Sequence, residues 1–204
     1  LVLAGAGSGK TRTLIYRVAY LLEKGVRPEE ILLVTFTNKA ADEMKSRVEV
    51  LLKSKAKGLW CGTFHHIGNR TLRMHGKELG LSPDFGILDD EDSRNLVKHC
   101  IRSLVAPGPS KFPKPSVVQS VLSFAVNSVT GLEQLLSRQY PYLLEFAGDL
   151  ERIQKLYTEK KKKTNHLDYD DLLARWLALL GRSETVRRHF SEQFRYSLVD
   201  EYHV

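Results

Sequence analysis

The chain has 204 residues, of which 42% are hydrophobic, enough to form one large core or two small ones. This composition excludes a chain that is disordered as a whole. Lysine and arginine outnumber aspartate and glutamate by 31 to 24, so the net charge of +7 favours polyanionic partners such as nucleic acids or nucleotides.

Cysteine usage and hydropathy suggest the cellular compartment of the protein. Cys61 and Cys100 fit neither a disulfide framework nor a zinc-binding spacing, so we expect buried thiols in a reducing, cytoplasmic setting. No apolar run approaches the roughly 20 residues needed to cross a bilayer, so we expect no membrane partner. The sequence begins inside one apolar run without an initiating Met and stops just after another, and we expect a fragment cut through its fold at both ends.

The first third of the chain predicts alternating strands and helices. Leu1 to Ala4 is expected to end a buried strand, and apolar residues at helical spacing from Leu14 to Leu22 predict a helix that ends at Gly25. A strand, a helix and a strand are expected next, at Ile31 to Phe36, Lys39 to Lys53 and Leu59 to Phe64. This order is typical of an open parallel sheet with right-handed crossovers.

After about His65, the helical period replaces strand-like runs. A proline-rich loop is expected from Pro107 to Pro115, and a last strand from Ser197 to Val199. Helices are expected at Asp89 to Leu104, Ser116 to Val129, Tyr142 to Lys162, Tyr169 to Leu180 and Glu184 to Phe194. The predicted architecture is an α/β domain, residues 1–65 and 195–204, interrupted by a helical insertion, residues 66–194, with the last strand returning to the first sheet.

The segment AGAGSGKT, Ala4 to Thr11, has the spacing of a phosphate-binding loop, with Ala in place of Gly at its first position. Glycines let backbone N–H groups surround a phosphate, and the next helix directs its positive end at the anion. Lys10 adds a charge for the β- and γ-phosphates, and the Thr11 hydroxyl can bind Mg²⁺. The alternative is a glycine-rich turn before a helix. The predicted phosphate-binding residues are Gly5, Ala6, Gly7, Ser8, Gly9, Lys10 and Thr11.

An acidic pair follows the last predicted strand. Asp200 would hold Mg²⁺ through its water shell, and Glu201 would polarise the water that attacks a γ-phosphate. Taken alone, acidic residues after a strand are typical of a solvated turn. The phosphate-binding loop favours the catalytic interpretation, because ligands gather at the carboxyl ends of parallel strands.

Polar and aromatic residues also follow the second and third predicted strands. Hydroxyls and amides that can contact phosphates, next to rings that can stack on bases, are the ingredients of a single-strand binding platform. Phe36 and Phe64 could equally close the core. His65 has only His66 as a neighbouring metal ligand, so we expect no metal site there. The platform residues are Phe36, Thr37, Asn38, Lys39, Thr63, Phe64 and His65.

The segments AGAGSGKT, VTFTNKAA, GTFH, FGILDDED, DYDDLL and LVDE occur in an order that resembles the N-terminal portion of the UvrD/Rep/PcrA-like superfamily 1 DNA helicases. The resemblance implies a partial RecA-like P-loop NTPase sheet with an all-helical inserted subdomain. It implies ATP and Mg²⁺ as cofactors, an additional nucleotide contact at Arg12, and single-stranded DNA and single/double-strand junctions as partners. It also implies ATP-driven unwinding, with 3′-to-5′ polarity, in DNA repair or replication.

The resemblance further implies a second motor domain of the same polypeptide. The arginines of that domain would stabilise the transition state, so the isolated fragment is expected to hydrolyse ATP poorly or not at all. The family follows its acidic pair with an aromatic residue and Gln, whereas Tyr202 is followed by His203. The alternatives are the motor of a helicase–nuclease, a P-loop NTPase unrelated to DNA, and a binding module without catalysis.

Two charged segments of the insertion have structural and functional interpretations. The lysines from Lys160 to Lys163 either contact a DNA backbone or form a solvated helix end. In DYDDLL, we expect Asp170 and Asp171 to cap a helix whose buried face includes Leu172, Leu173 and Trp176.

Overall fold

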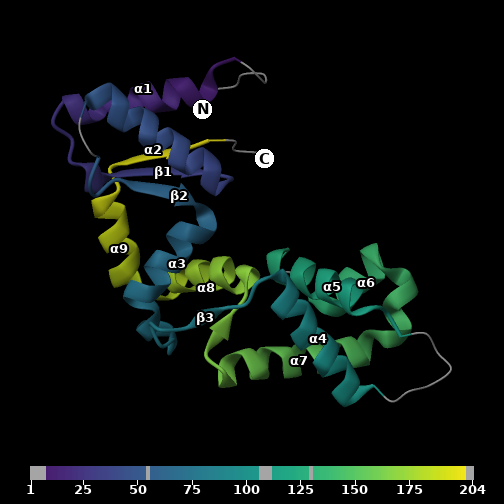
Figure 1. Cartoon of the computed structure of the whole chain (residues 1–204). Coiled ribbons are helices and arrows are strands. Elements are labelled where there is room, and N and C mark those ends of the chain that lie inside the picture. The colour runs from purple at the N-terminus through teal and green to yellow at the C-terminus, as the bar shows by residue number, and fades with distance from the viewer. Residues whose placement is uncertain (1–7, 54–55, 106–111, 129–130, 201–204) are drawn as a thin grey trace. The chain divides into compact units, whose positions relative to one another are not determined.

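The computed structural model describes residues 8–53, 56–105, 112–128 and 131–200. It forms two compact units (Figure 1). The first, which we call the sheet unit, comprises Leu1–His75 and Ala178–Val204; the second, the helical unit, comprises Gly76–Leu177. Among the described residues, no helix has the length and apolarity required to cross a membrane.

A three-stranded parallel sheet forms the centre of the sheet unit. Its order is β2 (Trp60–Thr63), β1 (Ile31–Thr35) and β5 (Tyr196–Val199). In this register Thr35 lies opposite Thr63 and Val34 lies opposite Val199. The predicted return of the last strand to the first sheet is therefore confirmed. The strand expected at Leu1 to Ala4 lies outside the described residues.

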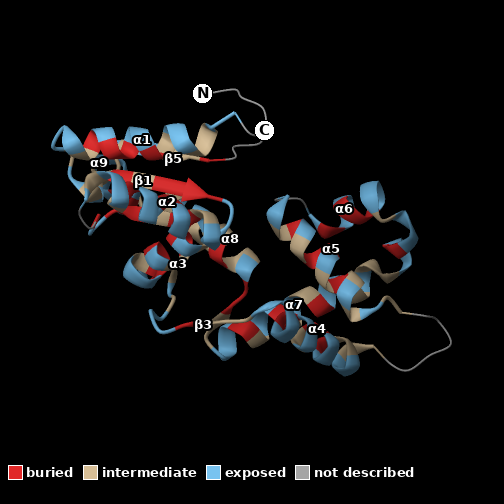
Figure 2. Cartoon of the chain, turned by 45° about the horizontal axis from the view of Figure 1, so that its top comes forward, coloured by how far each residue is buried: buried red, intermediate tan, exposed pale blue. Residues whose placement is uncertain are grey.

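Helices cover both faces of this sheet (Figure 1). On one face lie α1 (Lys10–Glu23) and α2 (Asn38–Leu52), which share a buried cluster with Ile31 and Leu33. On the other face lie α3 (Phe64–His75) and α9 (Glu184–Gln193), where the Trp60 ring meets the Phe190 ring edge-on at 5.8 Å. Successive residues of each strand therefore face opposite helix layers. Figure 2 shows that β1, between these layers, is buried. A short 3₁₀ turn, η1 (Pro28–Glu30), leads into β1.

The two cysteines lie in different units. Cys100 is fully buried, as expected, whereas Cys61 is half-buried on β2 and its Sγ donates to the Ala41 carbonyl at 3.4 Å. Burial raises the pKa of the Cys61 thiol to about 11 and also raises the pKa of Cys100. Both thiols therefore remain protonated near neutral pH, and neither is an activated nucleophile.

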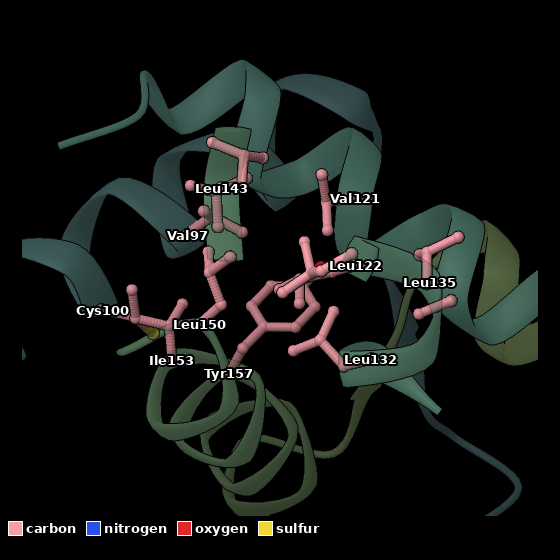
Figure 3. Close-up of a cluster of buried hydrophobic side chains, with 13 residues drawn as sticks. Val97, Cys100, Val121, Leu122, Leu132, Leu135, Leu143, Leu150, Ile153 and Tyr157 are labelled. Carbon is pink, nitrogen blue, oxygen red and sulfur yellow. The ribbon is translucent and has the colours of Figure 1, made fainter. Parts of the chain in front are cut away.

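The helical unit contains a large buried apolar cluster (Figure 3). Val97 from α4, Val121 from α5, Leu136 from α6 and Ile153 from α7 all contribute to it. Asp89 caps α4 as expected, since its carboxylate accepts from the Asp92 N–H at 2.8 Å. The elements are η2 (Gly76–Leu79), α4 (Asp90–Leu104), α5 (Pro115–Asn127), α6 (Leu132–Gln139), η3 (Pro141–Phe146) and α7 (Ala147–Lys163). Residues 106–111 of the expected proline-rich loop lie outside the described residues.

A parallel pair of two-residue strands in the helical unit was not expected from the sequence. β3 (Gly86–Ile87) pairs with β4 (His166–Leu167). A Cβ at Gly86 would lie 2.5 Å from the His166 ring, so a larger residue there would force that ring to move. Strands this short have no detectable alternation, which is why periodicity did not predict them.

The unit boundaries differ from the expected ones at residues 65/66 and 194/195. α3 begins directly after β2 and packs beside it, and α9 packs on Trp60, so both helices belong to the sheet unit. The second boundary falls within α8 (Tyr169–Arg182). Helical periodicity alone does not reveal which core a helix joins.

Lys161 fits neither of the interpretations given for the lysine run. It is only 6% exposed, and its ammonium contacts the carboxylates of Asp168 and Asp171. Its Nζ also lies 4.4 Å from the centre of the Tyr157 ring, whose hydroxyl donates to Asp168 at 2.8 Å. Although burial opposes it, the Lys161 charge and these hydrogen bonds hold the pKa of Asp168 below its usual value.

The start of α8 is capped as expected, but mainly by the acid that precedes it. Asp168 accepts from the Asp171 N–H at 2.8 Å, and Asp171 accepts from the Asp168 N–H at 3.3 Å. Asp170 instead accepts a hydrogen bond from the Asn127 side chain. On the apolar side, Leu172 is buried, while Leu173 and Trp176 are half-buried.

Candidate nucleotide-binding site

Two predicted Mg²⁺ ligands that are 189 residues apart in sequence meet in the structure. The Thr11 hydroxyl, in the first turn of α1, donates to Asp200 Oδ2 at 3.0 Å. Asp200 directly follows β5, and its N–H donates to the Val34 carbonyl at 2.8 Å, continuing the ladder between β5 and β1. Asp200, which carries this carboxylate, is buried, with 7% of its surface exposed. Sheet topology therefore brings the phosphate-loop helix and the acidic strand end into contact.

The N-terminus of α1 has the properties of an anion-binding site. Gly9 precedes the helix with φ +84°, a conformation that favours glycine, and this N-cap residue provides no side-chain hydrogen bond to the helix. The first turn contains no acidic residue, but does contain Lys10 and Arg12. Because cations are unfavourable near a helix N-terminus, a bound anion would stabilise this end. Gly5, Ala6 and Gly7 of the loop, and Glu201, Tyr202 and His203 after Asp200, lie outside the described residues.

A cleft of about 330 Å³ opens beside the Thr11–Asp200 contact. It lies at the carboxyl end of β1 and is lined by residues of α1 and α2. Its lining residues are Thr11, Ile15, Thr35, Phe36, Thr37, Ala40, Glu43, Met44, Arg47 and Asp200. Residues of the predicted nucleotide site and of the predicted DNA platform therefore share one cleft.

The oxygen atoms at this cleft suit Mg²⁺. Mg²⁺ prefers oxygen ligands, keeps several of its waters and is usually held by one or two protein carboxylates together with substrate phosphates. Thr11 and Asp200 provide one hydroxyl and one carboxylate that already lie within hydrogen-bonding distance. In the described ranges, no three or more His, Cys, Asp or Glu residues form a metal cluster.

Glu43 and Arg47, which line the cleft from α2, were not singled out in the sequence. They form an exposed ion pair at i,i+4 spacing. That spacing is visible in the sequence, but it is common on solvated helices. Their position beside Thr11 and Asp200 becomes apparent only when α1 and α2 pack on the same face of the sheet.

The predicted DNA platform lies at the expected strand ends, where β1 passes into α2 and β2 passes into α3. Phe36 is 78% exposed and Phe64 is 42% exposed, so neither ring closes the core. Asn38 and Lys39 are exposed in the first turn of α2, and His65 is half-buried.

The two threonine hydroxyls of this platform have local structural partners. Thr37 accepts from the Ala40 N–H at 3.1 Å and so caps α2. Thr63, which is buried, accepts from the His66 N–H at 3.2 Å at the start of α3. Their hydroxyls therefore stabilise helix N-termini.

The model of the UvrD/REP helicase N-terminal domain family matches residues 1–203. This chain belongs to the UvrD/REP helicase family. The similar proteins include the ATP-dependent DNA helicase PcrA of Bacillus subtilis (strain 168), which is 38% identical over 203 residues. The PcrA proteins of Staphylococcus epidermidis (strain ATCC 12228 / FDA PCI 1200) and Staphylococcus aureus (strain COL) are 36% and 34% identical. Each comparison covers 99% of this chain and 27% of the relative, so the chain spans about a quarter of each relative's length.

UvrD/REP membership confirms the resemblance drawn from the six sequence segments, and it agrees with the observed α/β sheet and helical unit. The roles of individual residues remain predictions.

Proposed function

We propose that this chain is the first, nucleotide-binding part of an ATP-dependent DNA helicase that moves along single-stranded DNA. The observation on which the proposal rests is the Thr11–Asp200 hydrogen bond at the amino end of α1. This bond joins residues from the two ends of the chain, which supports assigning them to one ATP–Mg²⁺ site. The finer features, 3′-to-5′ polarity, action at single/double-strand junctions and a role in DNA repair or replication in the cytoplasm, follow from the family resemblance.

In this proposal each residue has a separate task. Backbone N–H groups from Gly5 to Gly9 and the α1 dipole bind phosphates, and Lys10 neutralises the β- and γ-phosphates. Thr11 and Asp200 would hold Mg²⁺, which would neutralise phosphate charge. Glu201 would polarise the attacking water, and Arg12, whose guanidinium lies 5.4 Å from the centre of the Tyr16 ring, would contact the nucleotide.

Single-stranded DNA is the proposed partner at the strand ends. The exposed Phe36 and Phe64 rings can stack on bases, and Asn38 and Lys39 lie beside Phe36 for contacts with phosphates. The helical unit has as many acidic as basic residues in its sequence, so the net charge of +7 resides in the sheet unit. This charge distribution favours the sheet unit as the surface for a polyanion.

The other candidates make different predictions. A P-loop NTPase unrelated to DNA has no reason to expose Phe36 at 78% beside its nucleotide cleft. A helicase–nuclease motor shares this geometry, and only a nuclease segment elsewhere in the polypeptide distinguishes it. A binding module without catalysis binds nucleotide but never turns it over.

Nucleotide binding, measured with a fluorescent non-hydrolysable ATP analogue with and without Mg²⁺ and single-stranded DNA, tests the proposal. We expect Mg²⁺ to strengthen nucleotide binding, and single-stranded DNA to change its affinity while a blunt duplex has a smaller effect. Catalytic turnover, measured in parallel, should be slow, because the transition-state arginines belong to a second motor domain. Nucleotide binding that is independent of Mg²⁺, or whose affinity single-stranded DNA does not change, would contradict the helicase proposal.

A further inference from the structure

Three buried polar residues form a row across the carboxyl end of the sheet. Thr35 lies opposite Thr63 in the pairing of β1 with β2. Continuing the β1–β5 register by one residue, as the bond from the Asp200 N–H to the Val34 carbonyl requires, places Thr35 opposite Asp200. Their exposed fractions are 8% for Thr63, 2% for Thr35 and 7% for Asp200.

All three side chains belong to the sheet face that α1 and α2 cover. Strand side chains alternate between faces, so Thr35 shares a face with Ile31 and Leu33, which pack against α1 and α2. Asp200 reaches Thr11 on α1 from the same side. Thr35 and Asp200 are thus side-by-side neighbours on adjacent strands, a separation that a hydroxyl and a carboxylate can bridge.

Thr35 has a hydroxyl that the fold itself does not use. The hydroxyl of Thr63 accepts a bond from His66 N–H, and that of Thr11 donates to Asp200. Within the part of the chain that the structure describes, no group forms a hydrogen bond with the Thr35 hydroxyl, although Thr35 lines the cleft beside Asp200. Because this hydroxyl belongs to a residue that lines the cleft, it is available to groups at that cleft.

We propose that Thr35 is a positioning residue for Asp200, an inference that rests on the proposed function. With nucleotide and Mg²⁺ in the cleft, the Thr35 hydroxyl donates to the Asp200 carboxylate and fixes its orientation. The Thr11 oxygen can ligate the metal while its hydrogen is still donated to Asp200. A donor from the neighbouring strand adds a further restraint on the carboxylate, as partners behind metal ligands commonly do.

The position of Thr35 also links the two proposed binding functions. It is bonded directly to Phe36, the exposed ring proposed to stack on DNA bases. Any shift of the end of β1 that accompanies DNA binding therefore moves the donor that holds Asp200. Coupling between two sites requires such a shared element.

The test compares Thr35→Val, which removes the hydroxyl but keeps the shape, with Thr35→Ser, which keeps the hydroxyl. Thr71→Val is the matched control, because Thr71 is a buried threonine on α3 that does not line the cleft. The readout is the Mg²⁺ concentration that half-saturates the enhancement of binding of a fluorescent non-hydrolysable ATP analogue. Thermal unfolding confirms that each variant folds, and Thr35→Ala replaces Thr35→Val if the latter does not.

We expect the removal of the hydroxyl to raise the half-saturating Mg²⁺ concentration about ten-fold, the scale of one hydrogen bond to a charged group. Thr35→Ser and Thr71→Val should stay within about two-fold of the unchanged chain, and metal-free nucleotide binding should be equal in all four proteins. An unchanged Mg²⁺ requirement in Thr35→Val, or an equal increase in Thr35→Ser, would overturn this inference alone. Failure of the unchanged chain to bind nucleotide would instead overturn the proposed function, and this inference with it.

Discussion

Phe36 exposes 78% of its surface directly beside a cleft lined by buried polar groups. The sequence left two interpretations of this ring open, because a phenylalanine at a strand end is as typical of a core as of a stacking surface. The pattern could not decide between them, since the direction of one side chain at a strand end depends on how the following turn is built. In the structure the ring is exposed, and Thr37 begins α2 immediately afterwards.

Replacing Phe36 with alanine tests the stacking surface. We expect binding of a short single-stranded oligonucleotide to weaken by about 1–3 kcal/mol, the typical contribution of one base–aromatic stack. Fluorescence anisotropy measures the change. Tyr142→Ala is the control, because Tyr142 is also a highly exposed aromatic residue, at 66%, but belongs to η3. Equal losses in both variants, or no loss in Phe36→Ala, would remove Phe36 from the DNA surface.

At the scale of elements, long helices were easier to predict from the sequence than short strands. Apolar spacing correctly predicted α1, α4, α5, α8 and α9, because burial of one face repeats along each helix. It did not predict the two-residue strands β3 and β4, which are held by a partner far along the chain. The sequence also did not predict that one residue of the lysine run, Lys161, is buried. Lys161 follows Ile153 and Tyr157 at intervals of four residues and so lies on the buried face of α7.

The buried ammonium of Lys161 predicts a large difference between adjacent lysines. Lys161→Met leaves the Asp168 and Asp171 carboxylates buried without their cation, so we expect the free energy of unfolding to fall by about 3–5 kcal/mol. Lys162→Met removes an exposed charge from the next position and should change it by no more than about 0.5 kcal/mol. Urea unfolding followed by circular dichroism measures both values. Similar losses in the two variants would show that the cluster does not stabilise the chain.

At the scale of the whole chain, the central result is the convergence of two distant segments. The sequence predicted that Thr11 and Asp200 belong to one site, because a phosphate-binding loop needs an acidic partner from a neighbouring strand. It could not predict that Thr35 lies beside Asp200 on the adjacent strand and on the same face of the sheet, because register is a property of the folded sheet. Motifs thus predicted which residues form the site, while the topology of the sheet placed Thr35 beside one of them.

The most direct test of this account is the Mg²⁺ dependence of nucleotide binding in Asp200→Asn, with Asp170→Asn, an acidic residue of the helical unit, as the control. Asparagine keeps the shape and can still accept the hydrogen bond from Thr11, but it lacks the charge that binds Mg²⁺. We predict that Asp200→Asn loses most of the Mg²⁺ enhancement while keeping metal-free nucleotide binding, and that Asp170→Asn behaves as the unchanged chain. An undiminished Mg²⁺ enhancement in Asp200→Asn would contradict the claim that Thr11 and Asp200 form one ATP–Mg²⁺ site.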